Sequence, residues 1–356
     1  MMKKIMITLD FPPEYGGIQR YLYNIVKHTY SPDDIVVVGS RRNYNFDDKN
    51  ISCKVSYFST PVSVINKKFS LIPLILYLLR FRKKFSGGVD IECGNLYAAI
   101  GPLVLSFIFD INYSVFCYGK ELILLQKKGL KPVFLRLVLN RAKKLYYISS
   151  YTAQLIRKAC PESSLSCLPP RIESNYLLNS DSFEKPFEKL CLLSVGRLVE
   201  HKGHEYLIYA AEALPRTIQW TLTIAGSGPY EKYLKKLVEK LNVSDKVSVK
   251  TSLDDNSLRK EYQKANIFVF PSLETKTGTE GFGIALLEAM AYKLPIIASR
   301  TGGIMEVIEY GRCGICVNPG NSDEIKAAIL KLVDNQQLRQ ELIKNATDNL
   351  LKNYVW

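Results

Sequence analysis

Short, almost uninterrupted apolar runs alternate with amphipathic helical patterns along this 356-residue chain. Apolar runs of this kind are typical of parallel strands that are buried on both faces. The runs are Ile35–Gly39, Leu190–Gly196, Trp220–Gly226, Ile267–Ser272 and Pro295–Ser299, and a first strand is expected at Ile5–Leu9. Helical patterns that begin at Tyr21, His204, Tyr230 and Glu324 separate them. The alternation predicts βαβ units and an α/β fold.

A polar stretch near mid-chain, Glu173–Lys189, contains Pro186 and has no periodicity, so we interpret it as a linker. The chain is long enough for two domains. We expect a Rossmann-like domain over residues 1–180 and a second over residues 181–356. Ligands of such sheets bind outside the carboxyl ends of the strands.

The stretch EGFGIALLEAMA, residues 280–291, carries the strongest chemical signal. Gly281 and Gly283 permit a tight turn, and the strong helix formers after them predict a helix that begins near Gly283. A Gly-rich turn at a helix N-terminus is an anion site that fits a diphosphate. Glu288 would lie roughly 7–8 Å further along the helix, within reach of ribose hydroxyls, whereas Glu280 can accept hydrogen bonds from a sugar. The alternative is an amphipathic helix with Glu288 on its solvated face.

A pair of cations follows the strand that ends at Gly196. Arg197 offers a bidentate fork and Lys202 a point charge, a combination that suits a diphosphate. The alternative is surface charge around a turn, and we expect both side chains on a surface loop.

Other glycines mark strand-to-helix turns. Gly16 and Gly17 follow Phe11-Pro-Pro-Glu-Tyr, and Gly226 and Gly228 lie in a Gly-Ser-Gly-Pro turn. Each pair by itself is also explained by an ordinary turn between a strand and a helix. Thr301-Gly-Gly-Ile-Met-Glu306 follows the last of the apolar runs.

Taken in order from Phe11 to about Pro319, these motifs resemble those of the retaining, family 4 glycosyltransferases of group 1 type, which have the GT-B fold. The resemblance implies two Rossmann-like domains that face each other across a cleft, with acceptor binding in the first and nucleotide-sugar binding in the second. It implies that Arg197 and Lys202 bind the donor phosphates, that Glu280 contacts the transferred sugar, and that Glu288 holds the ribose. The backbone positions implied to face the donor are Gly196, Gly226, Gly228, Gly281, Phe282, Gly283 and Ile284. Gly16 and Gly17 are implied to face either the donor diphosphate or the acceptor.

The chain departs from the family pattern at Tyr118, where the family usually has a His that helps to place the transferred sugar. A tyrosine hydroxyl can also donate a hydrogen bond to a sugar, so we treat Tyr118 as a catalytic candidate. The alternative is a packing residue at a strand end. The family's usual last helix, which crosses back to the first domain, is either shortened here or lies beyond Trp356.

The positive charge is concentrated in the first half of the chain. Residues 1–185 hold 26 Lys and Arg against 14 Asp and Glu, whereas residues 186–356 hold 22 against 20. Basic and apolar residues are interleaved in Lys67–Lys84 and in Lys120–Lys144, which favours an anionic membrane surface as a partner, with a solvated rim around the domain core as the alternative. No nucleic-acid motif accompanies the charge.

Eight scattered Cys include the spacing Cys313-Gly-Ile-Cys316, but no second pair completes a zinc site. We expect no signal peptide and a cytoplasmic protein, peripheral on the inner face of the membrane.

The sequence thus predicts a metal-independent, retaining hexosyltransferase. Its donor is a UDP- or GDP-sugar, its acceptor is a glycan or a lipid-linked glycan, and it needs no cofactor. The expected role is cell-envelope or exopolysaccharide synthesis. The alternative is a catalytically weak nucleotide-sugar-binding paralogue, because Tyr118 replaces the usual His. A dinucleotide oxidoreductase would require Gly-x-Gly-x-x-Gly after the first strand, which is absent.

Overall fold

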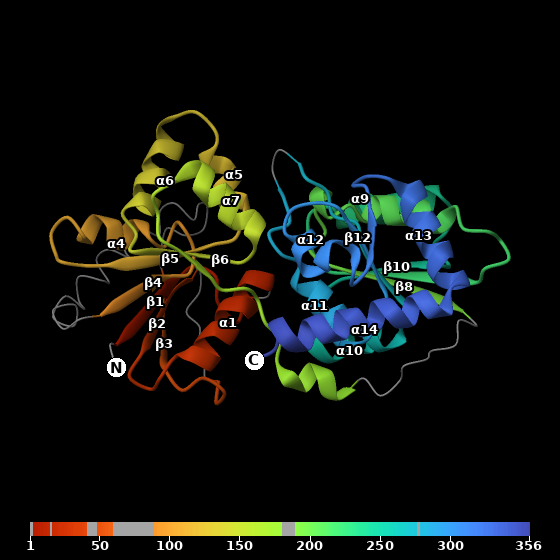
Figure 1. The fold of residues 1–356 in the computed structure, drawn as a ribbon, viewed down its shortest axis with the longest axis horizontal. Helices are drawn as coiled ribbons and strands as arrows, with labels where there is room; N and C mark the ends of the chain where they lie inside the picture. The colour runs from red at the N-terminus through yellow and green to blue at the C-terminus, as the bar shows by residue number, and fades with distance from the viewer. Residues whose placement is uncertain (1–2, 15, 41–47, 60–88, 180–188, 276–277) are drawn as a thin grey trace. The chain divides into compact units, whose positions relative to one another are not determined.

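A computed structural model of the chain describes residues 3–14, 16–40, 48–59, 89–179, 189–275 and 278–356 (Figure 1). Their contacts divide the chain into two compact units, Met1–Pro170 and Arg171–Trp356. The boundary expected from the sequence is residue 180, ten residues later. Residues after Pro170 pack with the C-terminal unit, because Ile172 pairs with Val355 and the 3₁₀ helix η1 (Ser174–Asn179) contacts the helix α11 (Ile284–Ala291).

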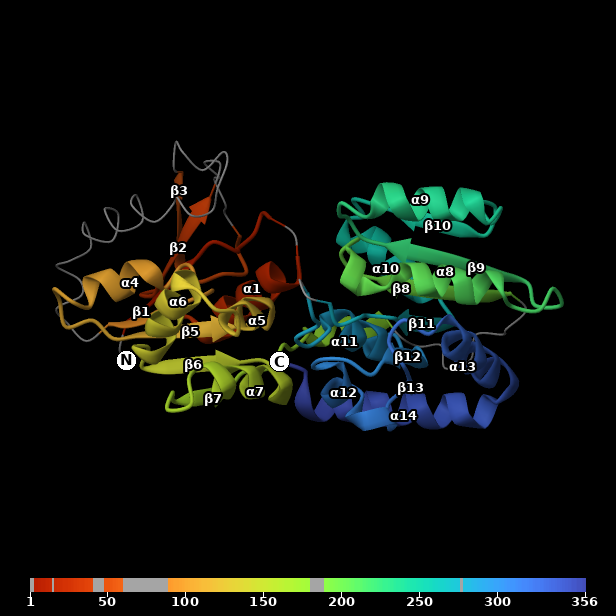
Figure 2. The ribbon, with the colours of Figure 1, turned by 90° about the horizontal axis from the view of Figure 1, so that it is seen from above.

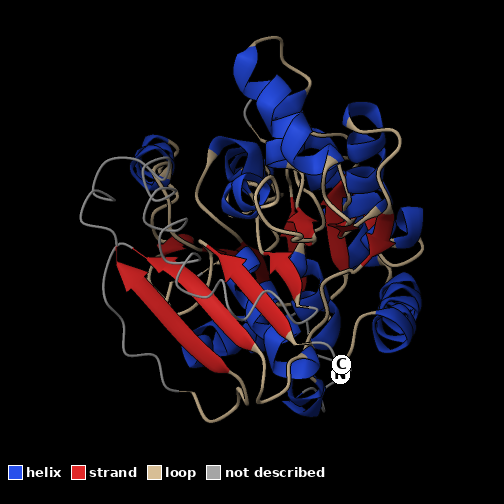
Figure 3. Cartoon of the chain, turned by 90° about the vertical axis from the view of Figure 1, so that its left-hand side faces the viewer, coloured by secondary structure: helices blue, strands red, loops and turns tan. Residues whose placement is uncertain are grey.

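The N-terminal unit is built around seven parallel strands in the order β3-β2-β1-β4-β5-β6-β7. Strands are drawn as red arrows in Figure 3. The strands are β1 (Lys4–Thr8), β2 (Ile35–Ser40), β3 (Lys54–Ser59), β4 (Asp90–Cys93), β5 (Tyr113–Cys117), β6 (Lys144–Tyr147) and β7 (Leu165–Cys167). The described helices are α1 (Gly17–Thr29), α4 (Ile100–Leu105), α5 (Lys120–Leu125), α6 (Leu130–Asn140) and α7 (Ser150–Ala159).

The core of this unit lies between the sheet and its helices. Ile5, opposite Ile35 and Ile91 in the register, packs in one buried cluster with Leu135 of α6 and Leu155 of α7. The helices α5, α6 and α7 accordingly lie next to one another on one side of the sheet (Figure 1).

The C-terminal unit has six parallel strands in the order β10-β9-β8-β11-β12-β13, which can be followed from top to bottom in Figure 2. The strands are β8 (Leu190–Val195), β9 (Trp220–Ala225), β10 (Val247–Lys250), β11 (Ile267–Phe270), β12 (Ile296–Ser299) and β13 (Ile315–Val317). The helices are η2 (Glu200–Lys202), α8 (His204–Glu212), α9 (Glu231–Lys240), α10 (Asp255–Lys264), α11 (Ile284–Ala291), α12 (Ile304–Val307), η3 (Glu309–Gly311), α13 (Ser322–Asp334) and α14 (Gln336–Asn353).

Helices cover both faces of the second sheet. In Figure 1, α9 and α13 lie above the strands, and α10 and α14 lie below them. Leu207 of α8, Leu234 of α9 and Ile329 of α13 share one buried cluster with the inner residues of the strands. On the other side, α14 packs against α11.

The expected α/β class and the two Rossmann-like sheets are confirmed. In both sheets the order of strands reverses once, between β1 and β4 and between β8 and β11. Such a reversal is the point at which open α/β sheets bind ligands. Among the described residues, no helix is both long enough and apolar enough to span a membrane.

Candidate functional site

The predicted donor residues of the C-terminal unit gather at the carboxyl edge of its sheet, beside the reversal between β8 and β11. The loop after β8 carries Arg197 and Lys202, and the loop after β11 carries Glu280 and leads into α11. Because all six strands are parallel, these loops leave the sheet at the same edge. The topology therefore brings together residues that lie up to about ninety positions apart in the sequence.

Two glycine loops are joined to each other through their backbones. The N–H of Gly196 donates to the carbonyl of Ala225 at 3.0 Å, and that of Leu198 donates to Ser227 at 3.0 Å. Gly226 has φ 154°, and a Cβ there would lie 1.8 Å from the carbonyl oxygen of Gly196. A Cβ at Gly228 would meet the carbonyl of Leu198 at 2.2 Å. The close approach that these two glycines allow is to the neighbouring loop, which fixes the backbone on either side of Arg197.

Lys202 and Glu280, for which we expected separate roles, form an ion pair. Lys202 ends the 3₁₀ helix η2, and its Nζ also lies 4.6 Å from the centre of the Phe270 ring. Its side chain is 13% exposed and that of Glu280 is 15% exposed. Arg197 is exposed as expected. The expectation of an open surface loop was therefore wrong for Lys202, because the end of β11 covers it.

The predicted helix after the Gly-Phe-Gly turn is confirmed as α11, and Gly283 is its N-cap. Gly283 has φ 95°, a left-handed conformation that favours glycine. Phe282 is buried against Tyr354, with ring centres 5.5 Å apart, and Ile284 is the first helical residue. The carbonyl of Glu280 accepts a hydrogen bond from the N–H of Gly303 at 2.9 Å. The turn is thus held on both sides of the buried Gly281.

Glu288 is 4% exposed, which rules out the solvated helix face that we considered as the alternative. Its Oε2 accepts a hydrogen bond of 2.7 Å from the hydroxyl of Tyr262 on α10. The Tyr262 ring stacks on Tyr292 and on Phe268, with centres 5.2 Å and 5.8 Å apart. A buried carboxylate held by a tyrosine hydroxyl is oriented before any ligand arrives.

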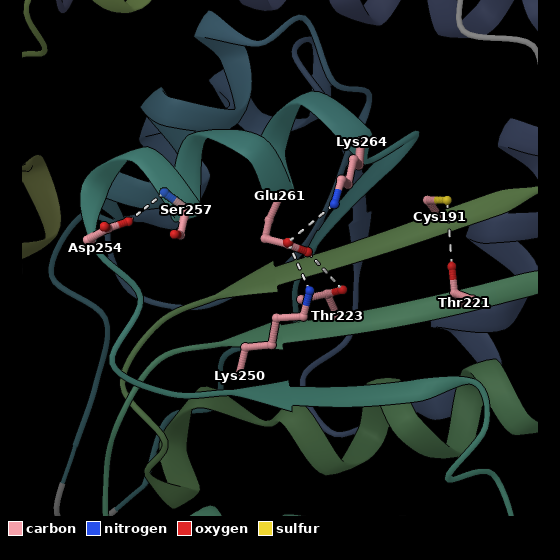
Figure 4. Close-up of polar contacts among 8 residues, drawn as sticks. All are labelled: Cys191, Thr221, Thr223, Lys250, Asp254, Ser257, Glu261 and Lys264. Atoms are coloured by element: carbon pink, nitrogen blue, oxygen red, sulfur yellow. Dashed lines mark hydrogen bonds and ion pairs between the residues drawn. The ribbon is translucent and has the colours of Figure 1, made fainter.

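The helix that carries Tyr262 is fastened to the sheet by the preceding residue, Glu261 (Figure 4). The two carboxylate oxygens of Glu261 accept hydrogen bonds from Lys250 Nζ at 2.9 Å and from Thr223 Oγ1 at 3.3 Å. At the N-terminus of α10, Asp254 accepts a hydrogen bond from the N–H of Ser257 at 2.7 Å. The position of Tyr262, and through it that of Glu288, is therefore set by β9 and β10.

His204, two residues after Lys202 in the sequence, is buried and neutral. Its Nδ1 lies 3.2 Å from the hydroxyl of Ser194 in β8. Burial, helped by the charge of Lys202, lowers the pKa of His204 to about 3. The imidazole is therefore a neutral packing and hydrogen-bonding group at physiological pH.

Three buried Ser and Thr hydroxyls close to the site have no hydrogen-bond partner within the described part of the chain. They belong to Ser272, after β11, and to Ser299 and Thr301, at the end of β12. Buried polar groups are rarely left unpaired, so this edge of the sheet has hydrogen-bonding capacity that the described residues do not use. Within those same residues, no group of three or more His, Cys, Asp and Glu side chains is placed to hold a metal ion.

Tyr118, at the end of β5 in the N-terminal unit, uses its hydroxyl within the protein. The hydroxyl donates to the carbonyl of Gly94 at 2.6 Å, and the ring meets Tyr21 edge-on, with centres 6.0 Å apart. Burial raises the pKa of Tyr118 well above its usual value, so the hydroxyl stays protonated. These contacts favour the packing alternative for this residue.

A polar group that we did not predict lies at the reversal between β1 and β4. The carboxylate of Asp10 accepts hydrogen bonds from Gln19 Nε2 at 3.2 Å and from Asn95 Nδ2 at 2.8 Å. Gly16, the N-cap of α1, and Gly17, its first residue, complete the loop after β1. The position of Asp10 directly after the first strand was a usable signal, since carboxyl ends of parallel strands carry ligand sites.

The structure thus brings most of the predicted donor residues to one edge of one sheet. Gly16, Gly17 and Tyr118 belong to the N-terminal unit. Sequence reasoning missed Tyr262, because nothing in α10 other than a tyrosine within a polar helix marks it.

Residues 178–349, nearly all of the C-terminal unit, match the family Glycosyl transferases group 1. Among proteins of similar sequence, an uncharacterized glycosyltransferase of Methanocaldococcus jannaschii is 36% identical over 165 residues, which is 46% of this chain and 41% of that protein. A GDP-mannose-dependent alpha-(1-6)-phosphatidylinositol monomannoside mannosyltransferase of Mycobacterium tuberculosis is 26% identical, covering 94% of this chain and 89% of that protein.

Solved structures resemble the chain over its whole length. Sucrose-phosphate synthase from Thermosynechococcus elongatus superposes with a TM-score of 0.81 at 18% identity, covering 99% of this chain and 95% of that one. Anabaena HepE in complex with UDP and glucose gives a TM-score of 0.80 at 18% identity, covering 100% and 96%. At such identities the likeness describes the fold.

Proposed function

Because this chain is a glycosyltransferase of group 1 type with the GT-B fold, we propose that it transfers a hexose from a UDP- or GDP-sugar to a hydroxyl of a glycan or lipid-linked acceptor, with retention at the anomeric carbon. Both nucleotides occur among its relatives. The mycobacterial relative is named for GDP-mannose, and the Anabaena structure holds UDP.

The observation that carries the proposal is the composition of the edge beside β8 and β11. An exposed guanidinium lies in the loop after β8 together with a mostly buried ammonium, which pairs with the carboxylate of Glu280. The loop after β11 leads from Glu280 to a helix N-terminus, and that helix carries the second, buried carboxylate. Cations and a helix N-terminus suit a diphosphate, and carboxylates suit sugar and ribose hydroxyls.

Each side chain then has a distinct task. Arg197 and Lys202 bind the donor diphosphate, together with the first amides of α11, and Glu280 accepts hydrogen bonds from the transferred sugar. Glu288, already held by Tyr262, accepts from the ribose hydroxyls. We assign the backbone at Gly196, Gly281, Phe282, Gly283 and Ile284 to the same donor site, while Gly226 and Gly228 support the loop of Arg197.

The proposed reaction breaks the bond between the anomeric carbon and the diphosphate oxygen. The acceptor oxygen forms its new bond on the same face of the sugar, and the departing diphosphate oxygen takes the acceptor proton. Negative charge grows on the diphosphate as the bond breaks, and Arg197 and Lys202 stabilise it without a metal. In the N-terminal unit, Gly16, Gly17 and the Asp10 group would face the acceptor.

The role of Tyr118 separates two versions of the proposal. If its hydroxyl also contacts the sugar, it takes the place of the family's histidine. If Tyr118 only packs, the chain could be the weak nucleotide-sugar-binding paralogue, which binds donor without turning it over. The hydrogen bond from Tyr118 to Gly94 is the reason to keep this alternative.

The partner and place in the cell are part of the proposal. We expect an acceptor of the cell envelope or of an exopolysaccharide, reached from the cytoplasmic face of the membrane. The basic segment Lys120–Lys144 supports an anionic membrane surface as partner, whereas Lys67–Lys84 lies entirely outside the described residues.

The test is release of nucleotide from a panel of UDP- and GDP-hexoses, measured with EDTA present and with total glycan extract as the acceptor. We expect release from at least one donor, unaffected by EDTA. Tight donor binding without release from any of them would favour the paralogue, and the absence of both would contradict the proposal.

A further inference from the structure

Helix α6 is apolar on two opposite faces. Its inner face is formed by Pro132, Leu135, Val138 and Leu139, which are buried in the core of the N-terminal unit. Its outer face carries Leu130, Val133, Phe134 and Leu137, which are 90%, 59%, 42% and 45% exposed. We call these four side chains the α6 ridge. A surface helix normally carries polar residues on its outer face.

The spacing of the α6 ridge shows that it is one continuous stripe. From Leu130, the other three residues follow at three, four and seven positions, which places all four on one side of a helix. Single exposed apolar residues are common on protein surfaces, but contiguous ones mark an interaction site.

The apolar surface continues beyond α6. Phe107 and Ile108, which follow α4, are 61% and 70% exposed. The guanidinium of Arg141, the C-cap of α6, lies 4.6 Å from the centre of the Phe107 ring. Phe107 therefore extends the apolar surface at the C-terminal end of the helix.

The rim of this surface is basic. Lys127 and Lys128 lie in the exposed loop before α6, Lys131 is exposed on its first turn, and Arg141 ends it. No Asp or Glu occurs from Leu122 to Lys144. The occupant of the α6 ridge must therefore be apolar at its centre and anionic around it.

We propose that the α6 ridge inserts into the surface of an anionic membrane. A lipid surface has acyl chains beneath a layer of negative headgroups, which matches both parts of this face. A second copy of the chain fits less well, because a two-fold contact through the ridge would set the same lysines against each other. With 11 residues α6 is about 16 Å long, so it would lie in the interface.

The position of α6 in the fold connects membrane insertion of the ridge with the proposed acceptor side of the N-terminal unit. Strand β5 ends at the carboxyl edge of its sheet, and α5 and a short loop lead from there to Leu130 at the start of α6. In parallel sheets the helix then returns toward the start of the next strand, so the Leu130 end of the ridge lies on the side of the Asp10 group. A ridge inserted in the membrane would bring a lipid-linked acceptor to this side of the unit. That role rests on the proposed function, whereas insertion of the ridge does not.

The first experiment is cosedimentation of the full chain with vesicles of phosphatidylcholine alone or of phosphatidylcholine with phosphatidylglycerol. We expect binding to the anionic vesicles and much weaker binding to the neutral ones. The affinity of the double variant Leu130→Gln/Phe134→Gln for anionic vesicles should be lower by about tenfold or more, since it removes two apolar groups from the interface. Leu351→Gln, at a leucine 52% exposed in the C-terminal unit, is the matched control and should bind as the unmodified chain does.

The second experiment separates charge at the rim from overall charge. Reversal of Lys127, Lys128 and Lys131 to Glu should reduce binding by about a hundredfold or more, because each base near anionic lipid contributes roughly a factor of five. The control reverses three exposed lysines of α9, Lys232, Lys236 and Lys240, which changes the net charge equally. Similar losses in the two triple variants would overturn the proposal.

Insertion itself is measured with Phe134→Trp and lipids brominated along their acyl chains. We expect quenching of the new fluorescence in anionic vesicles, and its absence would overturn the proposal. So would a concentration-dependent dimer that the double glutamine variant abolishes, since the ridge would then bind a second copy. Nucleotide release in solution, followed for the same variants, should stay unchanged, so a failure of membrane binding is distinguishable from a failure of the glycosyltransferase assignment.

Discussion

The ion pair between Lys202 and Glu280 gives a prediction that the sequence alone did not contain. The proposed donor places a diphosphate beside Lys202, where Glu280 competes for the ammonium and repels the phosphates. Replacing Glu280 with Gln removes the negative charge but keeps the size and the hydrogen-bonding groups of the side chain. We therefore expect Glu280→Gln to bind free UDP or GDP more tightly, although it transfers sugar poorly.

The magnitude follows from the strength of the contact. A hydrogen bond to a charged group contributes about 1.5–3 kcal/mol and one to a neutral group about 0.5–1.5 kcal/mol. Glu280→Gln should therefore make the free energy of nucleotide binding more favourable by roughly 1 kcal/mol, which corresponds to about a fivefold lower Kd. Turnover should fall by about 10²–10³-fold, as when a preorganised group at a reacting centre is lost.

The same pair determines the effect on stability of removing the cation. Lys202→Met leaves the Glu280 side chain, which is 15% exposed, without its partner, and this costs about 3 kcal/mol of unfolding free energy, at the lower end for a buried pair. The double variant Lys202→Met/Glu280→Gln should regain most of that loss, because no charge is then left unpaired. Urea unfolding of the two single variants and the double variant measures this coupling.

The assay for the first effect is calorimetric titration of UDP and GDP into the unmodified chain and into Glu280→Gln. Lys250, whose amine contacts Glu261, offers a matched ion pair away from the proposed phosphates, so Glu261→Gln should not tighten nucleotide binding. An unchanged or weaker nucleotide affinity in Glu280→Gln would refute the view that the carboxylate competes for Lys202.

Three further predictions concern residues around the site. Tyr262→Phe, which removes the hydrogen bond to Glu288, should weaken nucleotide binding about fivefold in titrations. The effect should vanish in a Glu288→Gln background, and an equal effect in both backgrounds would mean that Tyr262 acts through packing alone. The pKa of His204 is lowered to about 3, so the folded state binds fewer protons than the unfolded state below the ordinary pKa near 6.5. The contribution of His204 to the unfolding free energy is therefore fully present above about pH 6.5 and is lost as the pH falls toward 3. Between pH 7 and 5.5 the unmodified chain should therefore lose about 1 kcal/mol more unfolding free energy than His204→Gln in urea titrations, and parallel losses would contradict the burial of a neutral imidazole. Tyr118→Phe should lower the unfolding free energy by about 1 kcal/mol and leave nucleotide release within about twofold, whereas unchanged stability with a several-fold slower release would support the sugar contact instead.

The parts of the fold that depend on local pattern could be predicted from the sequence. Strands β2, β8, β9 and β11 begin where their apolar runs begin, because a strand buried on both faces has no polar position to blur its ends. Helix α11 starts after Gly283, because the turn needs a left-handed residue and the residues that follow are strong helix formers.

Contacts between distant segments could not be predicted in the same way. The Glu280 motif suggested a sugar ligand and the Arg197 loop suggested phosphate ligands, yet neither pattern encodes that Lys202 reaches Glu280 across the sheet edge. Tyr262 was missed for the same reason, since its partner lies in another helix. The exposure of the α6 ridge was also hidden, because an apolar residue on an inner face and one on an outer face look alike in sequence.

The most direct test of the central claim is nucleotide binding at the edge beside β8 and β11. Titrations of UDP and GDP should show binding of at least one of them to the unmodified chain. Arg197→Ala should weaken that binding about tenfold or more, because it removes a charged contact to the diphosphate without disturbing a buried partner. Arg216→Ala, at another exposed arginine of the same unit, should leave it unchanged. If neither nucleotide binds, or if both variants bind as the unmodified chain does, the assignment of a nucleotide-sugar site to this edge is contradicted.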